Sequence, residues 1–152
     1  MMETTKTNIV SIKNISISNK NYDQLIELYN YFGENKDLNY EKCNNILQNI
    51  LQNNNHNIFI YLDNSDNILG AITVLTEQKF IHNSKCVAHI EDFVVKKEYR
   101  SQNIGKDLMN YVINYAKQNN CYKIILDTNN KLVNYYSNYG FINKGIYMGY
   151  YF

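Results

Sequence analysis

The second half of the chain alternates between strand-like and helix-like hydrophobic patterns, and this alternation limits the folds open to it. An apolar run over residues 87–95 indicates a strand, and apolar side chains then recur at helical spacing over 104–116. A short apolar run over 122–126 indicates another strand. A short helix over 132–139, which Gly140 ends, and a last strand over 146–152 complete the pattern. Such alternation is typical of an α/β sheet.

The first half predicts two helices and an antiparallel meander. A strand over 10–17 carries a bulge between Ile12 and Ile15, and helices follow over 22–32 and 40–51, the first between a capping Asn21 and Gly33. Apolar runs at 58–62 and 68–75 predict a hairpin, and 79–82 pairs with 87–95. Together the patterns predict a single mixed, mostly antiparallel, twisted α/β sheet flanked by helices.

Length and charge exclude several classes of function. The 152 residues suit one domain over 1–152, in which we expect the polar residues 1–8 to be poorly ordered. A formal charge of +1 gives no overall field to attract nucleic acid or an acidic membrane. No apolar run approaches the roughly 18 residues of a membrane span, and three scattered cysteines suit a reducing compartment. We therefore expect a cytoplasmic protein without nucleic-acid or membrane partners.

The segment Ala88-His89-Ile90-Glu91-Asp92 is unusual for a strand that enters a core. Two adjacent carboxylates and a histidine interrupt a run that should be apolar there. A strand end that projects into solvent would explain this arrangement, and a functional site would explain it equally. Alternation along a strand would place Glu91 and Asp92 on opposite faces, so that both cannot face one ligand equally.

The junction Arg100-Ser101-Gln102-Asn103-Ile104-Gly105-Lys106 lies where a strand gives way to a helix. Turn-tolerant residues at a helix start expose free backbone N–H groups beside the positive end of the helix dipole, and these groups suit a pyrophosphate. An ordinary capped turn is the alternative. The segment is neither a Walker loop nor a GxGxxG dinucleotide fingerprint.

Four blocks, together with this junction, resemble the GNAT N-acetyltransferase superfamily, and within it the glucosamine-6-phosphate N-acetyltransferases. The pattern Arg-x-x-Asn-x-Gly is similar to the Gln/Arg-x-x-Gly-x-Gly/Ala pyrophosphate loop of that superfamily, with Asn103 at its first glycine. The resemblance runs over 77–152. The blocks are Lys79-Phe80-Ile81-His82, His89-Ile90-Glu91-Asp92, Cys121-Tyr122-Lys123-Ile124-Ile125-Leu126-Asp127 and Tyr135-Tyr136-Ser137-Asn138-Tyr139-Gly140-Phe141.

The resemblance implies the GNAT acyl-CoA N-acyltransferase fold and acetyl transfer from acetyl-CoA to glucosamine 6-phosphate, a step toward UDP-N-acetylglucosamine. It also implies a homodimer in which C-terminal segments reach the partner. The family often ends in basic residues at the sugar phosphate, whereas this chain ends Tyr150-Tyr151-Phe152. The alternatives are acetylation of another small amine, or a CoA-binding dimeric module without catalysis.

The resemblance also implies roles for individual residues. Acetyl-CoA lies along Phe93, Val94 and Val95, where the Val94 amide faces the thioester oxygen, and on the loop Arg100, Ser101, Gln102, Asn103, Ile104, Gly105 and Lys106. The catalytic residues are Tyr136, which donates a hydrogen bond to the CoA sulfur, Asp127 and Glu91. Glu91, Asp92 and Asp127 bind the amino sugar, Lys79 and His82 its phosphate, and Asn30 lines the sugar site. No HxH or HExxH spacing exists among the histidines, so we expect no metal.

Overall fold

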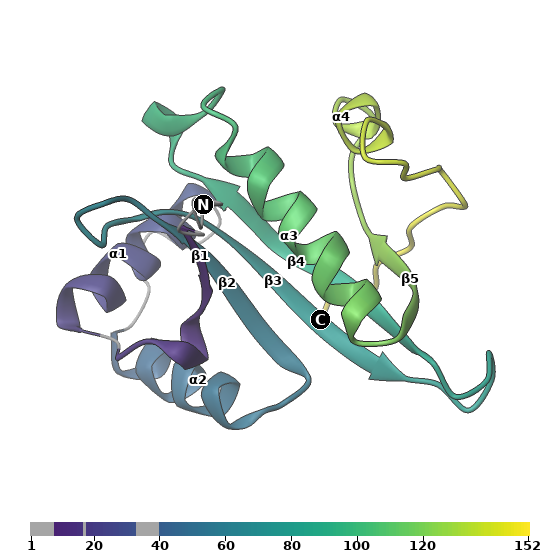
Figure 1. Ribbon diagram of the computed structural model, residues 1–152, viewed down its shortest axis with the longest axis horizontal. Coiled ribbons are helices and arrows are strands. Elements are labelled where there is room, and N and C mark those ends of the chain that lie inside the picture. Colours follow the sequence, from purple (N-terminus) through teal and green to yellow (C-terminus); the bar gives the residue numbers. More distant parts are fainter. Residues whose placement is uncertain (1–7, 17, 33–39) are drawn as a thin grey trace, which may run out of the picture.

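A computed structural model describes residues 8–16, 18–32 and 40–152, and in it five strands form one mixed sheet (Figure 1). The strands lie side by side in chain order: β1 (Ile9–Ser11), β2 (His56–Leu62), β3 (Ile68–Gln78), β4 (Cys86–Val95) and β5 (Cys121–Leu126). Neighbours from β1 to β4 pair antiparallel, and β5 runs parallel to β4. The predicted mixed, mostly antiparallel sheet is confirmed. Of the range 1–8, only Asn8 is described.

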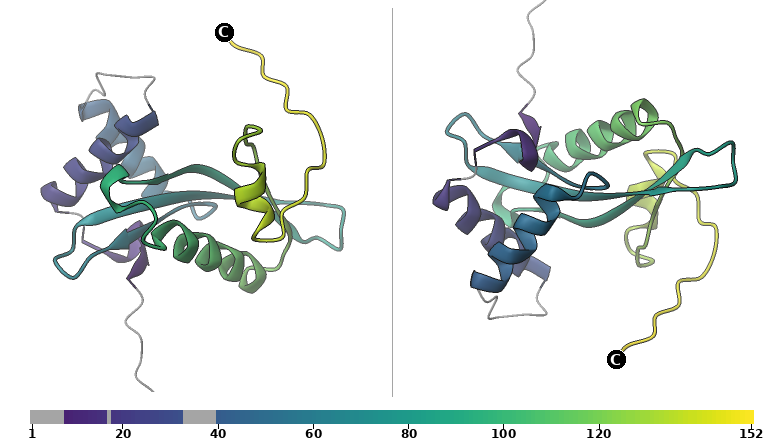
Figure 2. Two further views of the ribbon diagram at one scale, coloured as in Figure 1. Left: turned by 90° about the horizontal axis from the view of Figure 1, so that it is seen from above. Right: turned by 90° about the horizontal axis from the view of Figure 1, so that it is seen from below.

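The helices divide between the two faces of the sheet (Figure 2). Helices α1 (Asn19–Tyr29) and α2 (Tyr40–Gln52) cover one face, α3 (Ile104–Gln118) crosses the other, and the short α4 (Val133–Ser137) follows β5. Single turns of 3-10 helix lie at η1 (Ile12–Asn14), η2 (Asn30–Phe32) and η3 (Lys97–Tyr99). The cap of α1 is Ser18, whose hydroxyl accepts from the Asn21 amide at 3.2 Å, and not Asn21 as the sequence predicts.

Two apolar cores hold these layers together. On the α3 face, Leu108, Met109 and Val112 are fully buried against the strands. On the other face, Leu28 of α1 and Leu47 of α2 pack on the sheet with Ile60. At roughly 1.5 to 3 kcal/mol for each fully buried aliphatic side chain, these layers fix the positions of β3 and β4 from both sides.

Three predicted strands differ from the structure. The first ends at Ser11, because its hydroxyl accepts from the Lys13 amide and starts the turn η1. No strand covers 79–82, since β3 ends at Gln78 and three successive residues, His82, Asn83 and Ser84, take left-handed φ angles of 57°. Left-handed residues cannot continue a strand.

The expected last strand over 146–152 is also absent from the structure. This segment runs away from the sheet (Figure 2), and its apolar side chains stay in solvent, with Ile146 94% and Met148 89% exposed. Strand β5, predicted to be buried, is half-covered: Ile125 is 37% exposed and Lys123 is exposed. The reason is that α1 and α2 cover the face of the sheet only over the earlier strands.

Candidate active site

A bulge in β4 gives the two adjacent carboxylates their common orientation. Thr73 pairs with Glu91 and Ala71 with Val94, so that one residue of β3 lies opposite two of β4, and Asp92 takes a φ of 43°. Glu91 pairs directly with Thr73, so the two side chains lie on the same face of the sheet. Asp92 lines a pocket together with Thr73 and therefore lies on that face as well. The prediction that they point to opposite faces is wrong, because the extra residue cancels the alternation.

Asp127 lies level with Glu91 on the neighbouring strand. Ile90 pairs with Leu126 in the parallel ladder, and both contact the core under α3. The next residue of each strand therefore points to the opposite face, which α1 and α2 leave uncovered here. The structure thus brings Glu91, Asp92 and Asp127 to one open face of the sheet.

These charges act on one another. Burial, and then the Asp127 and Asp92 carboxylates, raise the pKa of Glu91 above its usual range, while His89 opposes this rise. Like charges in close proximity disfavour the ionised form. A carboxylate with a raised pKa is better matched to proton removal near neutral pH than an ordinary one.

The ladder between β4 and β5 ends at Ile90 and Leu126, which leaves the outer edge of β4 unpaired beyond that point. The Lys96 amide donates to the Leu69 carbonyl at 2.9 Å. Because alternate residues of an antiparallel strand bond to the same neighbour, the Val94 amide also points toward β3. The amides of Phe93 and Val95 then face the open edge. The alternation therefore favours Val95 or Phe93 over Val94 as the donor to the thioester oxygen, and this role stays a prediction.

The loop between β4 and α3 leads from this edge to a helix start. Ser101 and Asn103 take left-handed φ angles of 65° and 64°, and Asn103 is the N-cap of α3. The side-chain nitrogen Nε of Arg100 donates to the Val95 carbonyl at 3.2 Å and so ties the loop to β4. The first intrahelical bond of α3 runs from Asp107 to Asn103 at 2.9 Å. The amides of Ile104, Gly105 and Lys106 precede it and are free to bind an anion.

Gly105 lets α3 and α4 approach each other closely. A Cβ atom at this position would lie 3.0 Å from the Tyr135 hydroxyl and 3.4 Å from the Phe93 ring. A larger residue would therefore push the α4 tyrosines away from β4. This glycine is needed for space, because its φ is not in the left-handed region.

Tyr136 lies among aromatic rings at the edge of the α3 core. Its ring packs edge-on against Tyr135, with centroids 5.2 Å apart, and against Phe141 at 6.0 Å. Burial raises the pKa of Tyr136, with a smaller contribution from Tyr139. No hydrogen bond joins its hydroxyl to another group in the described part of the chain. A neutral tyrosine of this kind remains available as a hydrogen-bond donor.

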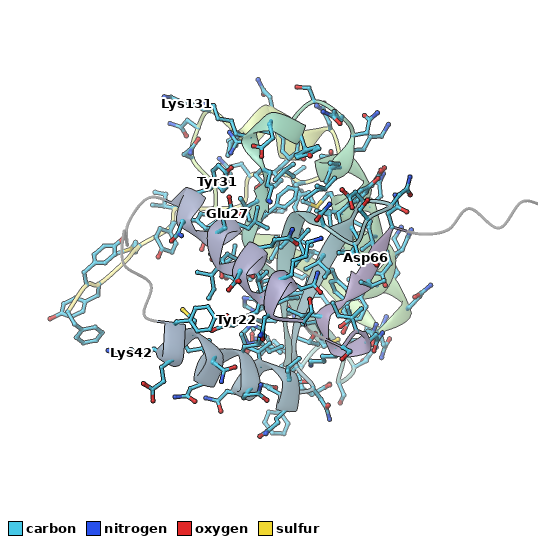
Figure 3. All side chains as sticks on the ribbon, turned by 90° about the vertical axis from the view of Figure 1, so that its left-hand side faces the viewer. Tyr22, Glu27, Tyr31, Lys42, Asp66 and Lys131 are labelled. Atoms are coloured by element: carbon cyan, nitrogen blue, oxygen red, sulfur yellow. The ribbon has the colours of Figure 1, made fainter. Side chains whose placement is uncertain are left out.

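Contacts with the loop after β4 hold the end of α1 beside the site. Lys96 lies 3.6 Å from the Glu27 carboxylate, and the Tyr31 hydroxyl donates to Glu98 at 3.4 Å. Figure 3 shows Glu27 on α1 and Tyr31 in the turn η2 that follows it. Asn30 is exposed at the C-cap of α1, and it does not line the pocket beneath that helix.

Lys79 and His82 lie at the other end of β4 from the carboxylates. The Lys79 ammonium pairs with Glu77, which also bonds the His89 ring at 3.0 Å, and the His82 ring stacks on Tyr122 at 4.0 Å. Lys79 follows Thr73, which lies opposite Glu91, by six positions along the chain, and six steps of strand span roughly 20 Å. One chain by itself does not bring these two side chains together with the carboxylates.

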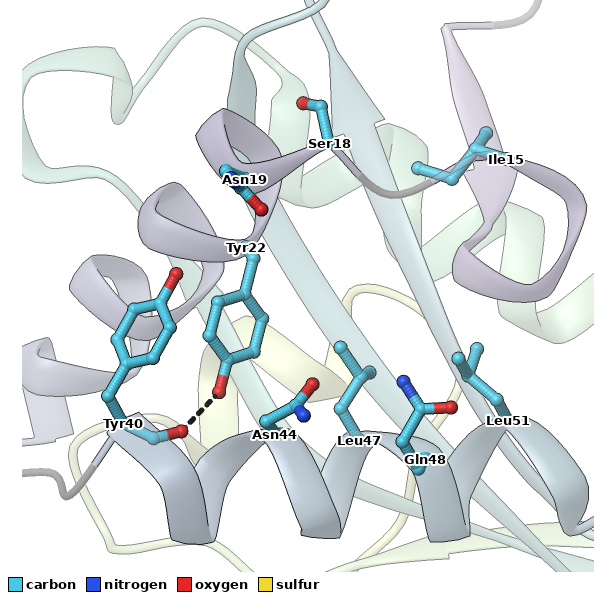
Figure 4. A pocket seen from close by; sticks show the side chains of 9 residues that line it. All are labelled: Ile15, Ser18, Asn19, Tyr22, Tyr40, Asn44, Leu47, Gln48 and Leu51. Atoms are coloured by element: carbon cyan, nitrogen blue, oxygen red, sulfur yellow. Dashed lines mark hydrogen bonds between the residues drawn. The ribbon is translucent and has the colours of Figure 1, made fainter.

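A hollow of about 440 Å³ between α1 and α2 lies outside this cluster. Figure 4 shows its lining, in which the Tyr22 hydroxyl donates to the Tyr40 carbonyl at 2.8 Å and the amides of Asn19 and Asn44 face one another across the space. Its lining contains no carboxylate, histidine, lysine or cysteine.

Two further properties bear on the class of the protein. Within 8–16, 18–32 and 40–152, no three His, Cys, Asp or Glu side chains gather as ligands of a metal ion. In the same ranges no helix combines the length and the apolar character that crossing a bilayer requires.

Comparison with known proteins decides the family. The model of the acetyltransferase (GNAT) family matches residues 21–141. The chain belongs to the GNAT family. Glucosamine 6-phosphate N-acetyltransferase 1 of Oryza sativa subsp. japonica is 34% identical over 85 residues, which cover 56% of this chain and 52% of that protein. The Arabidopsis thaliana enzyme of that name is 34% identical over 90 residues, 59% of this chain and 60% of that protein. The matched stretch thus spans about half the length of the rice relative.

Solved structures agree with this assignment. The crystal structure of glucosamine-6-phosphate N-acetyltransferase from Arabidopsis thaliana superimposes with a TM-score of 0.80 at 25% identity, covering 95% of this chain and 97% of that one. The GNAT fold predicted from the sequence is therefore confirmed.

Sequence reasoning missed one residue and one role. Glu77, which links Lys79 to His89, was not singled out, although its charge two residues before Lys79 at the end of an apolar strand was a signal. Gly105 was expected on the acetyl-CoA loop, but its close fit against Tyr135 depends on the approach of α3 to α4, for which one sequence contains no signal.

Proposed function

We propose that this GNAT protein transfers the acetyl group of acetyl-CoA to the amine of D-glucosamine 6-phosphate. The product would be N-acetylglucosamine 6-phosphate, on the route to UDP-N-acetylglucosamine in the cytoplasm. The observation that carries the proposal is the group of three carboxylates, Glu91, Asp92 and Asp127, level with the point where β4 and β5 part. The names of the rice and Arabidopsis relatives support the choice of acceptor.

The loop before α3 would hold the pyrophosphate of CoA. Its fit is supported by the free amides of Ile104, Gly105 and Lys106 and by the left-handed Ser101 and Asn103, which turn the backbone toward the helix axis. The exposed Arg100 and Lys106 add positive charge, and Gln102 donates to the Glu98 carbonyl at 3.4 Å, which steadies the loop. The helix dipole adds to the attraction for an anion.

The open edge of β4 would place the thioester. Phe93 and Val95 present amides there, and a fixed amide that points at a developing oxyanion stabilises the transition state without reorganisation. The Val94 side chain packs in the core under α1 and α2 and so holds this stretch of β4 in place. Removal of one such donor from an enzyme typically costs about 2.7 to 4 kcal/mol of transition-state stabilisation.

The carboxylates and Tyr136 would manage the protons. The amine arrives as an ammonium, and Glu91, with its raised pKa, accepts a proton while Asp92 and Asp127 orient the group. A bond then forms between the amine nitrogen and the acetyl carbon as the carbon–sulfur bond breaks. Tyr136 donates a hydrogen bond to the departing thiolate, and the thiolate takes up the second proton that the nitrogen sheds and becomes the free thiol.

A homodimer would complete the phosphate site. The C-terminal residues Ile146, Tyr147 and Met148 are 65% to 94% exposed, and β5 has an unpaired outer edge in the described chain. An extended apolar segment beside an open strand edge favours pairing between chains. Because Lys79 and His82 lie far along β4 from the carboxylates of their own chain, we propose that they reach the sugar phosphate bound by a second copy.

A thiol-release assay with acetyl-CoA and a panel of amines tests the acceptor. We expect glucosamine 6-phosphate to be used in preference to glucosamine, with full activity in EDTA. Lys79→Ala should raise KM for the phosphorylated sugar by roughly 10- to 150-fold and leave glucosamine unaffected, since a charge-assisted bond is worth about 1.5 to 3 kcal/mol. Equal losses for both sugars would show that Lys79 does not hold the phosphate.

A further inference from the structure

Two of the cysteines lie side by side where β4 and β5 begin. Cys86 is the first residue of β4 and Cys121 the first residue of β5, and the two are register partners in the parallel ladder. They are 35 residues apart in the chain, yet their Sγ atoms lie 2.8 Å from each other. The acetyl transfer proposed above uses neither thiol.

A bulge and the end of α3 bring the two thiols to the same place. Val87 pairs with Lys123, so that Tyr122 is an extra residue of β5 directly after the cysteine pair. Figure 1 shows the end of α3 beside the starts of these two strands. Cys86 is 5% exposed, whereas Cys121 is half-buried at the edge of the α3 core. Small molecules in solvent therefore reach the pair from the side of Cys121.

The backbone geometry suits a disulfide. A disulfide needs Cα atoms about 4.4 to 6.8 Å apart, and neighbouring strands of a sheet lie about 4.7 to 4.9 Å apart. Register partners whose sulfur atoms are in contact therefore meet this requirement without movement of the backbone. Cys43 packs with the core under α1 and α2, on the opposite face of the sheet, and reaches neither of them.

Hydrogen bonds hold the reduced pair in place. The Cys86 thiol donates to the Asn119 carbonyl at the end of α3, at 3.1 Å. Burial, and then the hydrogen bond with Cys86, raise the pKa of the Cys121 thiol to about 12. Since the thiolate is the reactive form, Cys121 reacts slowly. The pair therefore stays reduced in a reducing compartment and responds to an oxidant that persists.

We propose that Cys86 and Cys121 form a reversible disulfide site, which hydrogen peroxide oxidises and a dithiol reduces. One thiolate attacks a peroxide oxygen to give a sulfenic acid, and the other oxygen leaves as water. The second sulfur then bonds to the first, and the sulfenic oxygen leaves as a second water. Two thiols lose two electrons and two protons, which the peroxide takes up. This inference does not depend on acetyl transfer or on its acceptor.

The disulfide would close a segment that contains β4, α3 and the loop between them. A crosslink between residues so far apart in the chain restricts the unfolded state and thereby stabilises the folded one. It would also anchor the start of β5, which is half-covered. We expect the melting temperature of the oxidised protein to exceed that of the reduced protein by roughly 5 to 15 °C.

Peptide mapping tests the site directly. The full chain is treated with hydrogen peroxide, its free thiols are alkylated with iodoacetamide, and it is digested without reduction for mass spectrometry. The peptide of Cys86 should be joined to that of Cys121, while Cys43 is alkylated, and dithiothreitol should separate the joined peptides. Alkylation of all three cysteines after the treatment, or separate sulfinic acids at Cys86 and Cys121, would overturn the inference.

Melting temperatures of three variants test the consequence. Each protein is compared with its own reduced form, so that a change in its initial stability does not matter. Cys43→Ser, a matched control at another half-buried cysteine, should keep the gain on oxidation, and Cys121→Ser should lose it. Cys121→Ala repeats the test without an added hydroxyl. A gain below about 2 °C in the wild type, or an equal gain in either Cys121 variant, would overturn the inference.

Discussion

The two faces of the sheet at β4 and β5 differ more than any other two regions of the molecule. On one face, α3 buries Leu108, Met109 and Val112 completely against Ile90 and its neighbours. On the other, the side chains of Glu91, Lys123 and Asp127 are exposed. The same two strands therefore serve as a packed support on one side and as a reactive surface on the other.

This difference shows how a small domain can hold charged groups close together. Three neighbouring carboxylates repel one another and would drive a flexible segment apart. Here the apolar face under α3 fixes the strands that carry them. The free energy of that packing offsets the repulsion between the carboxylates. Substitutions on the packed face should change stability, and substitutions on the open face should change chemistry.

Leu108→Ala should give the largest effect. Leu108 is fully buried, and removal of such a side chain typically costs about 2 to 5 kcal/mol through lost burial and the cavity that remains. Urea unfolding followed by circular dichroism measures this loss, and kcat of the folded variant at low temperature should stay near that of the wild type. A loss below about 1 kcal/mol would mean that α3 is not the main support of these strands.

Tyr136→Phe should affect chemistry and not stability. Loss of a positioned donor should lower kcat by roughly 10- to 1,000-fold, while acetyl-CoA binding changes little. Tyr139→Phe is a matched control, because it removes a neighbouring hydroxyl that donates to the Tyr135 hydroxyl at 3.4 Å. Full kcat in Tyr136→Phe would show that this tyrosine contributes to packing and not to catalysis.

Asp127→Asn should move the pH profile of the reaction. Asp127 is the larger of the two carboxylate contributions to the raised pKa of Glu91, after burial. Glu91 must be deprotonated to act as a base, so the rate rises as pH increases through its pKa. With the neighbouring charge removed, that pKa falls, and the acidic limb of kcat/KM should shift to lower pH. If the acidic limb does not move, a group other than Glu91 determines it.

Lys123→Ala should have the smallest effect. Lys123 is exposed on the open face, and its ammonium lies 5.4 Å from the centroid of the Tyr122 ring. An exposed cation–π contact is worth at most about 1 kcal/mol, so the melting temperature should hardly change. A larger loss would reveal that this face is covered, as it would be in a dimer.

The sequence predicted those parts of the fold that repeat a pattern. The helices α2 and α3 follow the 3.6-residue period of their apolar side chains, and Gly140 ends the last helix with a φ of 88°. Asn103, which stands at the first glycine of the superfamily loop, takes the left-handed conformation that asparagine tolerates better than most residues. These features depend on local preferences that each segment carries by itself.

The missed features depend on single backbone angles or on distant segments. A φ of 43° at Asp92 turns two neighbouring carboxylates to one face, and no hydrophobic period reveals such an angle. The end of β3 at Gln78 likewise depends on the left-handed residues that follow Ile81. For the C-terminal segment, the apolar alternation predicts a strand, but pairing requires a neighbour that lies outside the single chain.

The loop at the start of α3 has a consequence for ligand-linked stability. Ser101 and Asn103 occupy a region that suits glycine, at a strain on the order of 1 kcal/mol each, although asparagine bears less. Glycine would relieve this strain but would give the unfolded loop more conformational entropy to lose. Non-glycine residues thus restrict the conformations of the unfolded loop and favour its folded shape. An anion that binds the folded loop should raise the melting temperature in proportion to the logarithm of the anion concentration.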